Sequence, residues 1–278
     1  MSKKLLILFS LFCFSFMPWH LGKDKEQFVE IRGKKQYYVI KGTGEPLVVF
    51  ITGLGPTMDD FSGLQNRIAK KTKTLCYNRA GVGKSESYNN ERSLENISAE
   101  LKELLDKVGI DKSVILVGHS RGGLILRYFI DKYPGKVCGA VLIDPALPEL
   151  KPMRRALRTT EEKIEFDKYY NSFITDSTKY SAIIRNEFRN FYTTDSVSVA
   201  NKGFINTIPT TIIGSVKATK DKYGKEDNTI KTELFNDYVK KFPQIKLVLT
   251  NKSGHFIHDE EPKLISDEIL LVIKKIKG

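Results

Sequence analysis

Short apolar runs alternate with longer segments of helical periodicity along most of the chain. Residues 46–51 and 113–117 are continuous apolar runs, which is typical of strands buried on both faces of a sheet. Residues 93–108 instead place six apolar side chains on one helical face. The same patterns predict strands over residues 27–31, 36–40, 73–77, 137–143, 209–213 and 245–249, and helices over 122–133, 232–241 and 262–276. Strands separated by helices predict an α/β fold, with a mostly parallel sheet flanked by helices.

The pattern changes between residues 147 and 205. This segment contains no convincing buried strand and is rich in charged and aromatic residues. We therefore expect a helical insertion within a single domain that covers residues 25–278.

The first 24 residues differ in kind from the rest. Lys3 and Lys4 precede an apolar run over residues 5–17, and Pro18 ends the run. This run is too short for a membrane span, which needs about 20 residues, but it is typical of a secretory signal. We expect an exported protein, or one associated with a membrane through this leader; without such a role for the leader the protein would be cytoplasmic.

Composition narrows the choice of partners. The 278 residues carry a formal net charge of +12, but the lysines are spread along the chain and mixed with acidic residues. Nucleic-acid binding needs a clustered basic patch, so we expect a small-molecule substrate and no nucleic acid. The three cysteines have no metal-ligand or redox spacing, so we predict no metal and no cofactor. The oligomeric state is not predicted.

The sharpest motif is Gly118-His119-Ser120-Arg121-Gly122-Gly123. It follows a predicted buried strand and opens a predicted helix, which is the context that a G-x-S-x-G nucleophile elbow requires. A sharp strand-to-helix turn leaves no room for side chains at the two outer positions and presents the serine hydroxyl above the sheet. Ser120 is therefore the candidate nucleophile.

A serine nucleophile needs a general base, normally a histidine. Of the four histidines, His20 lies in the leader, and His119 is expected to point away from the nucleophile. His255 directly follows a predicted strand, at the strand end where open α/β sheets place their sites. We favour His255 as the base and interpret His258 as a residue at the rim.

Acyl transfer also needs two backbone N–H groups to stabilise the developing oxyanion. Arg121, the residue after the nucleophile, is expected to supply one. The glycine-rich turn over residues 52–56 follows another predicted strand, and Leu54 within it is the candidate for the second.

With these motifs the chain resembles the α/β-hydrolase family over residues 27–278. Residues 77–85 are similar to the family's D-R-x-G-x-G-x-S turn, and residues 253–256 to its histidine motif. The resemblance implies an eight-stranded sheet, a lid inserted after the sixth strand, and the catalytic order Ser, acid, His. Thr52 and Asn78 depart from the family pattern, which commonly has histidine and aspartate there.

The acid of the triad is left open between two residues. The resemblance implies an acid just after the strand over residues 210–213, but Lys217 occupies that position. Asp144 ends the preceding strand, and some members of the family take their acid from that strand. Asp221 lies further along the loop and could fold back. We favour Asp144 over Asp221.

The prediction is a serine hydrolase for a small or medium, apolar acyl substrate, with a carboxylic ester favoured. An aminopeptidase or a lactonase could use the same triad. Epoxide hydrolysis is disfavoured, because that resemblance needs a carboxylate at position 120. A ligand receptor or binding protein on a hydrolase scaffold is the alternative from another class, motivated by the displaced acid.

Overall fold

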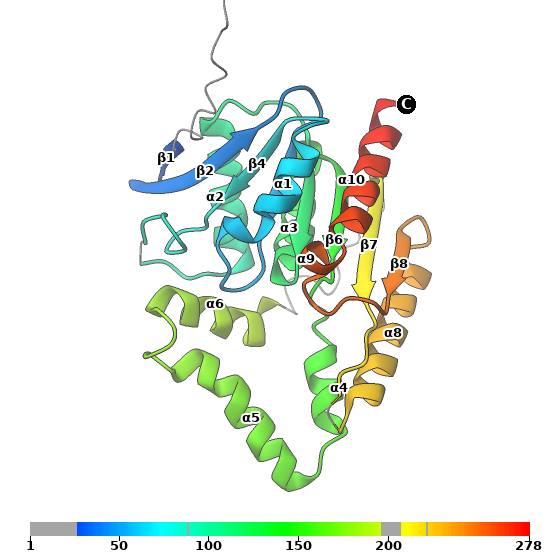
Figure 1. Cartoon of the computed structure of the whole chain (residues 1–278). Helices are drawn as coiled ribbons and strands as arrows, with labels where there is room; N and C mark the ends of the chain where they lie inside the picture. Colours follow the sequence, from blue (N-terminus) through cyan, green and yellow to red (C-terminus); the bar gives the residue numbers. More distant parts are fainter. Residues whose placement is uncertain (1–26, 88, 196–206, 221) are drawn as a thin grey trace, which may run out of the picture.

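A single eight-stranded sheet forms the centre of the molecule (Figure 1). The computed structural model describes residues 27–87, 89–195, 207–220 and 222–278. The sheet has the strand order β1-β2-β4-β3-β5-β6-β7-β8. The strands are β1 (Gln27–Ile31), β2 (Lys34–Lys41), β3 (Val48–Ile51), β4 (Thr74–Tyr77), β5 (Val114–His119), β6 (Val137–Ile143), β7 (Thr210–Ser215) and β8 (Lys246–Thr250). From β4 to β8 all neighbouring strands are parallel, whereas β2 pairs antiparallel with both β1 and β4.

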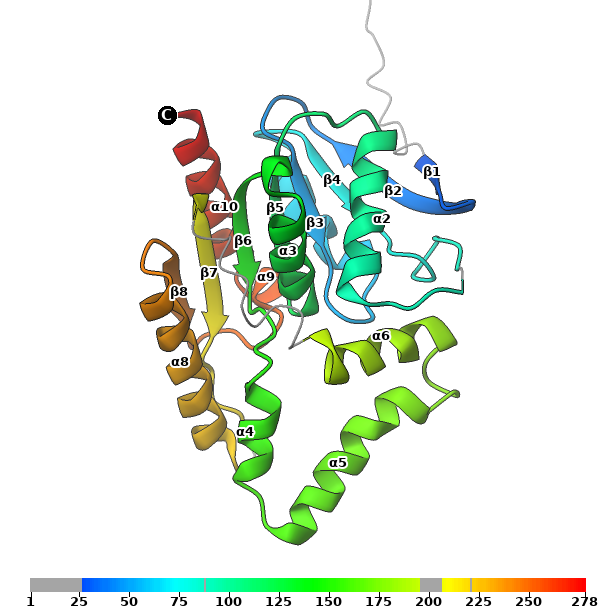
Figure 2. The same ribbon diagram turned by 180° about the vertical axis from the view of Figure 1, so that it is seen from behind.

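Helices cover both faces of this sheet, so the predicted fold class is confirmed (Figures 1 and 2). On one face, α1 (Ser62–Ile68) and α10 (Pro262–Lys277) pack on the strands through an apolar cluster that includes Ile68 and Ile269. On the other face, α2 (Leu94–Lys107), α3 (Arg121–Lys132) and α8 (Gly224–Lys241) form a second cluster with Leu101, Phe129 and Phe235. The central strands β3 and β5 are fully buried between the two layers, which explains why they read as unbroken apolar runs.

Among the described residues between β6 and β7 lie three helices: α4 (Leu150–Ala156), α5 (Thr160–Thr175) and α6 (Ala182–Thr193). They project beyond the carboxyl ends of the strands (Figure 1). In the described part of the predicted insertion, residues 147–195, we find helices and no strand. The short elements η1 (Met58–Phe61), η2 (Pro134–Lys136) and α9 (Ile257–Glu260) complete the described structure.

Two predicted segments lie partly or wholly outside the residues that the structure describes. The predicted leader, residues 1–24, lies outside the described residues, and so does the end of the predicted insertion. Within the described ranges, no helix has both the length and the apolar character that crossing a membrane requires.

Candidate active site

Ser120 occupies a strained turn between β5 and α3. Its φ angle is +52°, in the region that residues with a side chain rarely adopt. A Cβ atom at Gly118 would lie 2.5 Å from the carbonyl oxygen of Gly122, and one at Gly122 would lie 2.2 Å from that of Ile51. Both glycines are therefore required by close backbone contacts. The geometry is that of a nucleophile elbow.

Asp144 lies beside His255 at the same edge of the sheet. Asp144 directly follows β6, and its Oδ2 lies 2.6 Å from Nδ1 of His255, which is in the loop between β8 and α9. The other carboxylate oxygen, Oδ1, accepts a hydrogen bond of 2.9 Å from the backbone N–H of Ser215. Nζ of Lys231 lies 2.8 Å from Oδ1 and donates to Oδ2 at 2.9 Å. Asp144 is thus held on three sides.

These partners keep Asp144 ionised. Burial of the carboxyl group opposes its ionisation, but the hydrogen bond from His255 and the charge of Lys231 outweigh that effect. The pKa of Asp144 is consequently lowered from its ordinary value. An ionised carboxylate at Nδ1 fixes the imidazole tautomer, so that Nε2 of His255 is free to act as a base.

Ser120, Asp144 and His255 line one cavity of about 720 Å³. They come from the carboxyl ends of β5 and β6 and from the loop after β8, which lie together in the sheet. Asp221, the alternative acid, lies outside the described residues. Lys217, which occupies the position where the resemblance implied an acid, also lines this cavity.

The two predicted oxyanion donors lie on segments that meet at Ser120. Arg121 is the first residue of α3, so its N–H has no acceptor within the helix. A Cβ atom on Gly53, the residue before Leu54, would lie 3.2 Å from Cβ of Ser120. The turn that carries Leu54 therefore lies directly against the elbow. The role of Leu54 and Arg121 as donors remains a prediction.

Arg79 holds the turn that carries Leu54. Its guanidinium donates to the carbonyl oxygen of Thr52 at 3.0 Å, to Thr52 Oγ1 at 2.8 Å and to the carbonyl oxygen of Gly53 at 2.7 Å. The threonine at position 52, a departure from the family pattern, thus supplies an additional acceptor for Arg79. The other departure, Asn78, accepts a hydrogen bond of 2.7 Å from the N–H of Met58 and anchors the start of η1.

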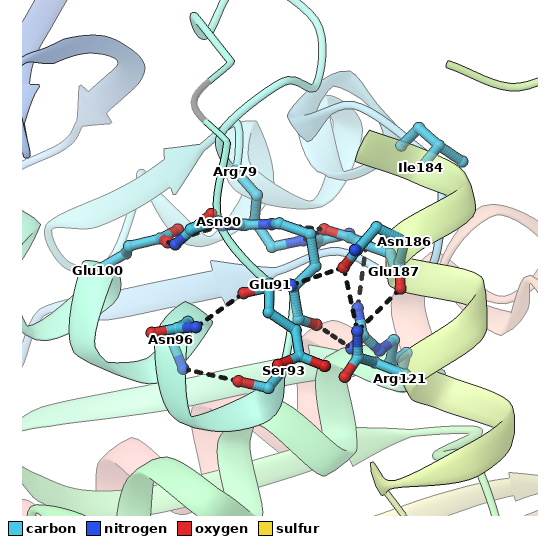
Figure 3. Close-up of polar contacts among 12 residues, drawn as sticks. Arg79, Asn90, Glu91, Ser93, Asn96, Glu100, Arg121, Ile184, Asn186 and Glu187 are labelled. Atoms are coloured by element: carbon cyan, nitrogen blue, oxygen red, sulfur yellow. Dashed lines mark hydrogen bonds and ion pairs between the residues drawn. The ribbon is translucent and has the colours of Figure 1, made fainter. Parts of the chain in front are cut away.

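A buried ionic cluster connects this turn to the helices beyond the sheet (Figure 3). Glu187, on α6, receives two hydrogen bonds of 3.0 Å from Arg79. Its carboxylate also lies 3.2 Å from Arg121 and 3.8 Å from Arg92. Burial opposes ionisation of Glu187, but the surrounding arginines lower its pKa to about 2. Arg121 is bound in turn by Asp195 at 2.7 Å. The side chain of Arg121, one predicted oxyanion donor, and that of Arg79, which holds the turn of the other, therefore meet at a single carboxylate.

This cluster was not predicted, because its members are far apart in the sequence. Glu187 lies 108 positions from Arg79. The signal that was available is the pair of arginines inside the two glycine-rich motifs, each of which needs a partner if buried. Nothing local in the sequence identifies Glu187 as that partner.

Substituting Glu187 with glutamine is expected to lower the free energy of unfolding by about 3–5 kcal/mol, because several buried arginines lose their shared counter-charge. Chemical denaturation of the variant and the wild type measures the difference. Glu165→Gln is the matched control: Glu165 is exposed on α5 and lies 3.9 Å from Lys168, so its change should stay within about 0.5 kcal/mol. Equal stability of both variants would contradict a cohesive role for the cluster.

His258 is not a rim residue, and that interpretation was wrong. Its side chain is buried against the ring of Phe61, and Nε2 lies 3.1 Å from Oδ2 of Asp60. The short helix α9 turns this side chain inward, away from the cavity that His255 lines. Among the histidines that the structure describes, His255 is therefore the one that lines the same cavity as Ser120.

His119 lies beneath His255. Its Nε2 is 2.9 Å from the backbone carbonyl oxygen of His255; because a carbonyl only accepts, this nitrogen carries the proton. Burial, with the nearby His255 and His258, lowers the pKa of His119 to about 3. Asp60, His119 and His258 form a described group whose ligand atoms, all within 4.8 Å of one another, could hold a metal ion. The hydrogen bond between Asp60 and His258 accounts for their approach without one.

The chain is similar to known proteins over most of its length. A family model described as the alpha/beta hydrolase fold matches residues 46–175. Methylesterase 2 of Arabidopsis thaliana is 23% identical over 233 residues, which cover 75% of this chain and 88% of the relative. Three other curated relatives, 27 to 31% identical, align over less than half of their own length, 42 to 47%.

Solved structures of two enzymes share the fold. A thermophilic esterase from Thermogutta terrifontis superposes with a TM-score of 0.65 at 18% identity, over 91% of this chain and all of that structure (100%). An epoxide hydrolase from Bacillus megaterium gives a TM-score of 0.68 at 16% identity, over 89% of this chain and 100% of that one. The overall architecture is thus common to different chemistries, and the residues of the site must distinguish them.

Proposed function

Because the chain belongs to the α/β-hydrolase fold family, we propose that it is a serine hydrolase that cleaves carboxylic esters through Ser120, His255 and Asp144. The observation that carries the proposal is the 2.6 Å contact between His255 Nδ1 and the buried carboxylate of Asp144, at the cavity that Ser120 lines. A base oriented by an acid, at the same cavity as a serine in a strained elbow, is the arrangement that activates a hydroxyl group.

The reaction follows from these positions. Nε2 of His255 accepts the proton of the Ser120 hydroxyl as Oγ attacks the ester carbonyl, and Asp144 stabilises the imidazolium that forms. The N–H groups of Leu54 and Arg121 stabilise the oxyanion. When the tetrahedral intermediate collapses, His255 gives its proton to the leaving alcohol and an acyl-enzyme remains. A water molecule, deprotonated by His255, then releases the carboxylic acid and restores Ser120.

The nucleophile favours ester cleavage over epoxide opening. An epoxide hydrolase of this fold would be expected to carry a carboxylate at position 120, where this chain has serine. The apolar side chains of Leu124, Leu147 and Phe191 line the cavity and suit the hydrocarbon part of an acyl substrate. An aminopeptidase or a lactonase would use the same residues and differ only in the leaving group.

The alternative is a ligand receptor on the same scaffold. The observation behind this alternative is Lys217, because a lysine occupies the position where the resemblance implied an acid. The contact between Asp144 and His255 supplies an acid from β6 instead, and this favours the enzyme.

Labelling with a fluorophosphonate separates the enzyme from the receptor. Such a probe reacts with activated serine hydroxyl groups, so we expect one adduct per chain, located on Ser120 by peptide mass spectrometry. Denatured protein is the control and should stay unlabelled, because the activation depends on His255 being held near Ser120. If the folded protein also stays unlabelled, the receptor is favoured and the hydrolase proposal fails.

A further inference from the structure

The cavity that holds Ser120 is lined by more positive than negative side chains. Five cationic residues line it: Lys151, Arg154, Arg155, Lys217 and Lys231. The described carboxylates that line it are Asp144, Asp167 and Asp227. An ordinary pocket for an apolar ester has no need of this many cations, so the pairing of each charge matters.

Each of these carboxylates already has a cationic partner within the cavity. Asp144 is bound by Lys231 at 2.8 Å, Asp167 by Arg155 at 2.7 Å, and Asp227 by Arg154 at 3.0 Å. Of the two remaining cations, Lys217 lies 3.6 Å from a carboxylate oxygen of Glu260. Lys151 remains.

Lys151 has no carboxylate within ion-pair distance among the described residues. Asp167, whose charge acts on the Lys151 ammonium, is itself occupied by hydrogen bonds from Arg155. Instead, Nζ of Lys151 lies over two aromatic rings, 4.3 Å from the centre of Tyr192 and 4.9 Å from that of Tyr170. Partial burial lowers the pKa of Lys151 from its ordinary value.

This setting suits an incoming anion. The aromatic rings hold the ammonium group by cation–π attraction and shield it from water, which strengthens its attraction for a negative charge. One unpaired cation balances one negative charge, so a carboxylate fits better than a phosphate dianion. Lys151 comes from α4 and its two rings from α5 and α6, so the helices that precede β7 together form this position.

We propose that the ester substrate carries a carboxylate at the end remote from the scissile bond, and that Lys151 binds this carboxylate. The inference rests on the proposed ester hydrolysis and narrows the substrate from an apolar acyl compound to the half-ester of a dicarboxylic acid. The apolar walls of the cavity would then contact the methylene chain between the two ends.

Matched ester pairs test the inference. Monoethyl esters of succinic, adipic and suberic acid are compared with ethyl butanoate, hexanoate and octanoate, which have a methyl group in place of the carboxylate. We expect kcat/KM of the wild type to be about tenfold higher for the acidic ester at one chain length at least, as for one charge-assisted contact. In Lys151→Met this ratio should fall to about one. In Lys151→Glu this ratio should fall below one. Ethyl aminocaproate, which carries an ammonium group at the remote end, should then be hydrolysed faster than the acidic ester.

The controls separate failure of the inference from failure of the proposed function. Lys168→Met removes an exposed lysine of α5 that does not line the cavity, and it should leave the ratio unchanged. If Lys151 only braces the helices, its variants will lower kcat/KM equally for both esters of a pair, and the inference is overturned. Ser120-dependent hydrolysis without any acidic preference also overturns it and leaves the proposed function intact. Absence of Ser120-dependent hydrolysis overturns both.

Discussion

Substituting Ser120 with alanine is expected to lower kcat for ester hydrolysis by about 10⁴-fold or more, since a nucleophile and its base act as a unit and neither suffices alone. The measurement is the rate of p-nitrophenol release from p-nitrophenyl esters. The variant should remain folded, because alanine meets the same constraint at a φ of +52° as serine does. Substrate should still bind, so the loss should appear in kcat rather than in KM.

Ser215 provides the matched control for this experiment. It lines the same cavity, and its hydroxyl donates to the carbonyl oxygen of Ser253 at 2.8 Å rather than to a histidine. Ser215→Ala should therefore keep activity within about tenfold of the wild type, the cost of one hydrogen bond. If Ser120→Ala hydrolyses esters as fast as the wild type, the nucleophile has been misassigned.

The fold could be predicted from the sequence because its central strands are buried on both faces. Burial of this kind demands unbroken apolar runs, and residues 46–51 and 113–117 have them. Predicted ends were less accurate where a helix is polar. Helix α8 begins at Gly224, whereas the predicted start was Thr232. The prediction missed the first turns because few residues of this helix are buried and those turns carry little apolar periodicity.

In the candidate site, too, local features could be predicted from the sequence, whereas features that depend on tertiary packing could not. The elbow at Ser120 is a local steric pattern, and its glycines are fixed by backbone contacts that any such turn would make. The choice between Asp144 and Asp221 depended on how separate loops pack at the edge of the sheet. The positive φ of Asp144, +37°, and the hydrogen bond from Ser215 place its carboxylate at His255, and neither is visible in the sequence.

Charged groups from distant elements were the least predictable part. Lys231 on α8 binds Asp144, and Glu187 on α6 binds both Arg79 and Arg121. A charge on an amphipathic helix is usually solvated, so no pattern in the sequence places these two residues next to the candidate active site. The burial of Glu187 follows from the path of the inserted helices, which only the three-dimensional structure defines.

Substituting Asp144 with asparagine is expected to lower kcat by about 10⁴-fold at neutral pH, as for a triad whose histidine is held in the wrong tautomer. An amide can donate a hydrogen bond to Nδ1 of His255, which puts the proton on Nε2 and removes the base from Ser120. Hydrolysis of p-nitrophenyl esters measures the loss. Lys231 would keep a neutral partner in place of its carboxylate, so a moderate loss of stability should accompany the loss of activity.

Two further variants make this prediction decisive. Asp227→Asn changes another carboxylate of the same cavity, one that pairs with Arg154 at 3.0 Å, and activity should stay within about tenfold of the wild type because the triad itself is unchanged. Asp221→Asn tests the other candidate acid and is expected to be active as well. The reverse result, an active Asp144→Asn and an inactive Asp221→Asn, would move the acid to the loop after β7. The hydrogen bond of 2.6 Å from His255 argues for Asp144, since an imidazole held this closely by an ionised carboxylate has its base nitrogen already directed away from it.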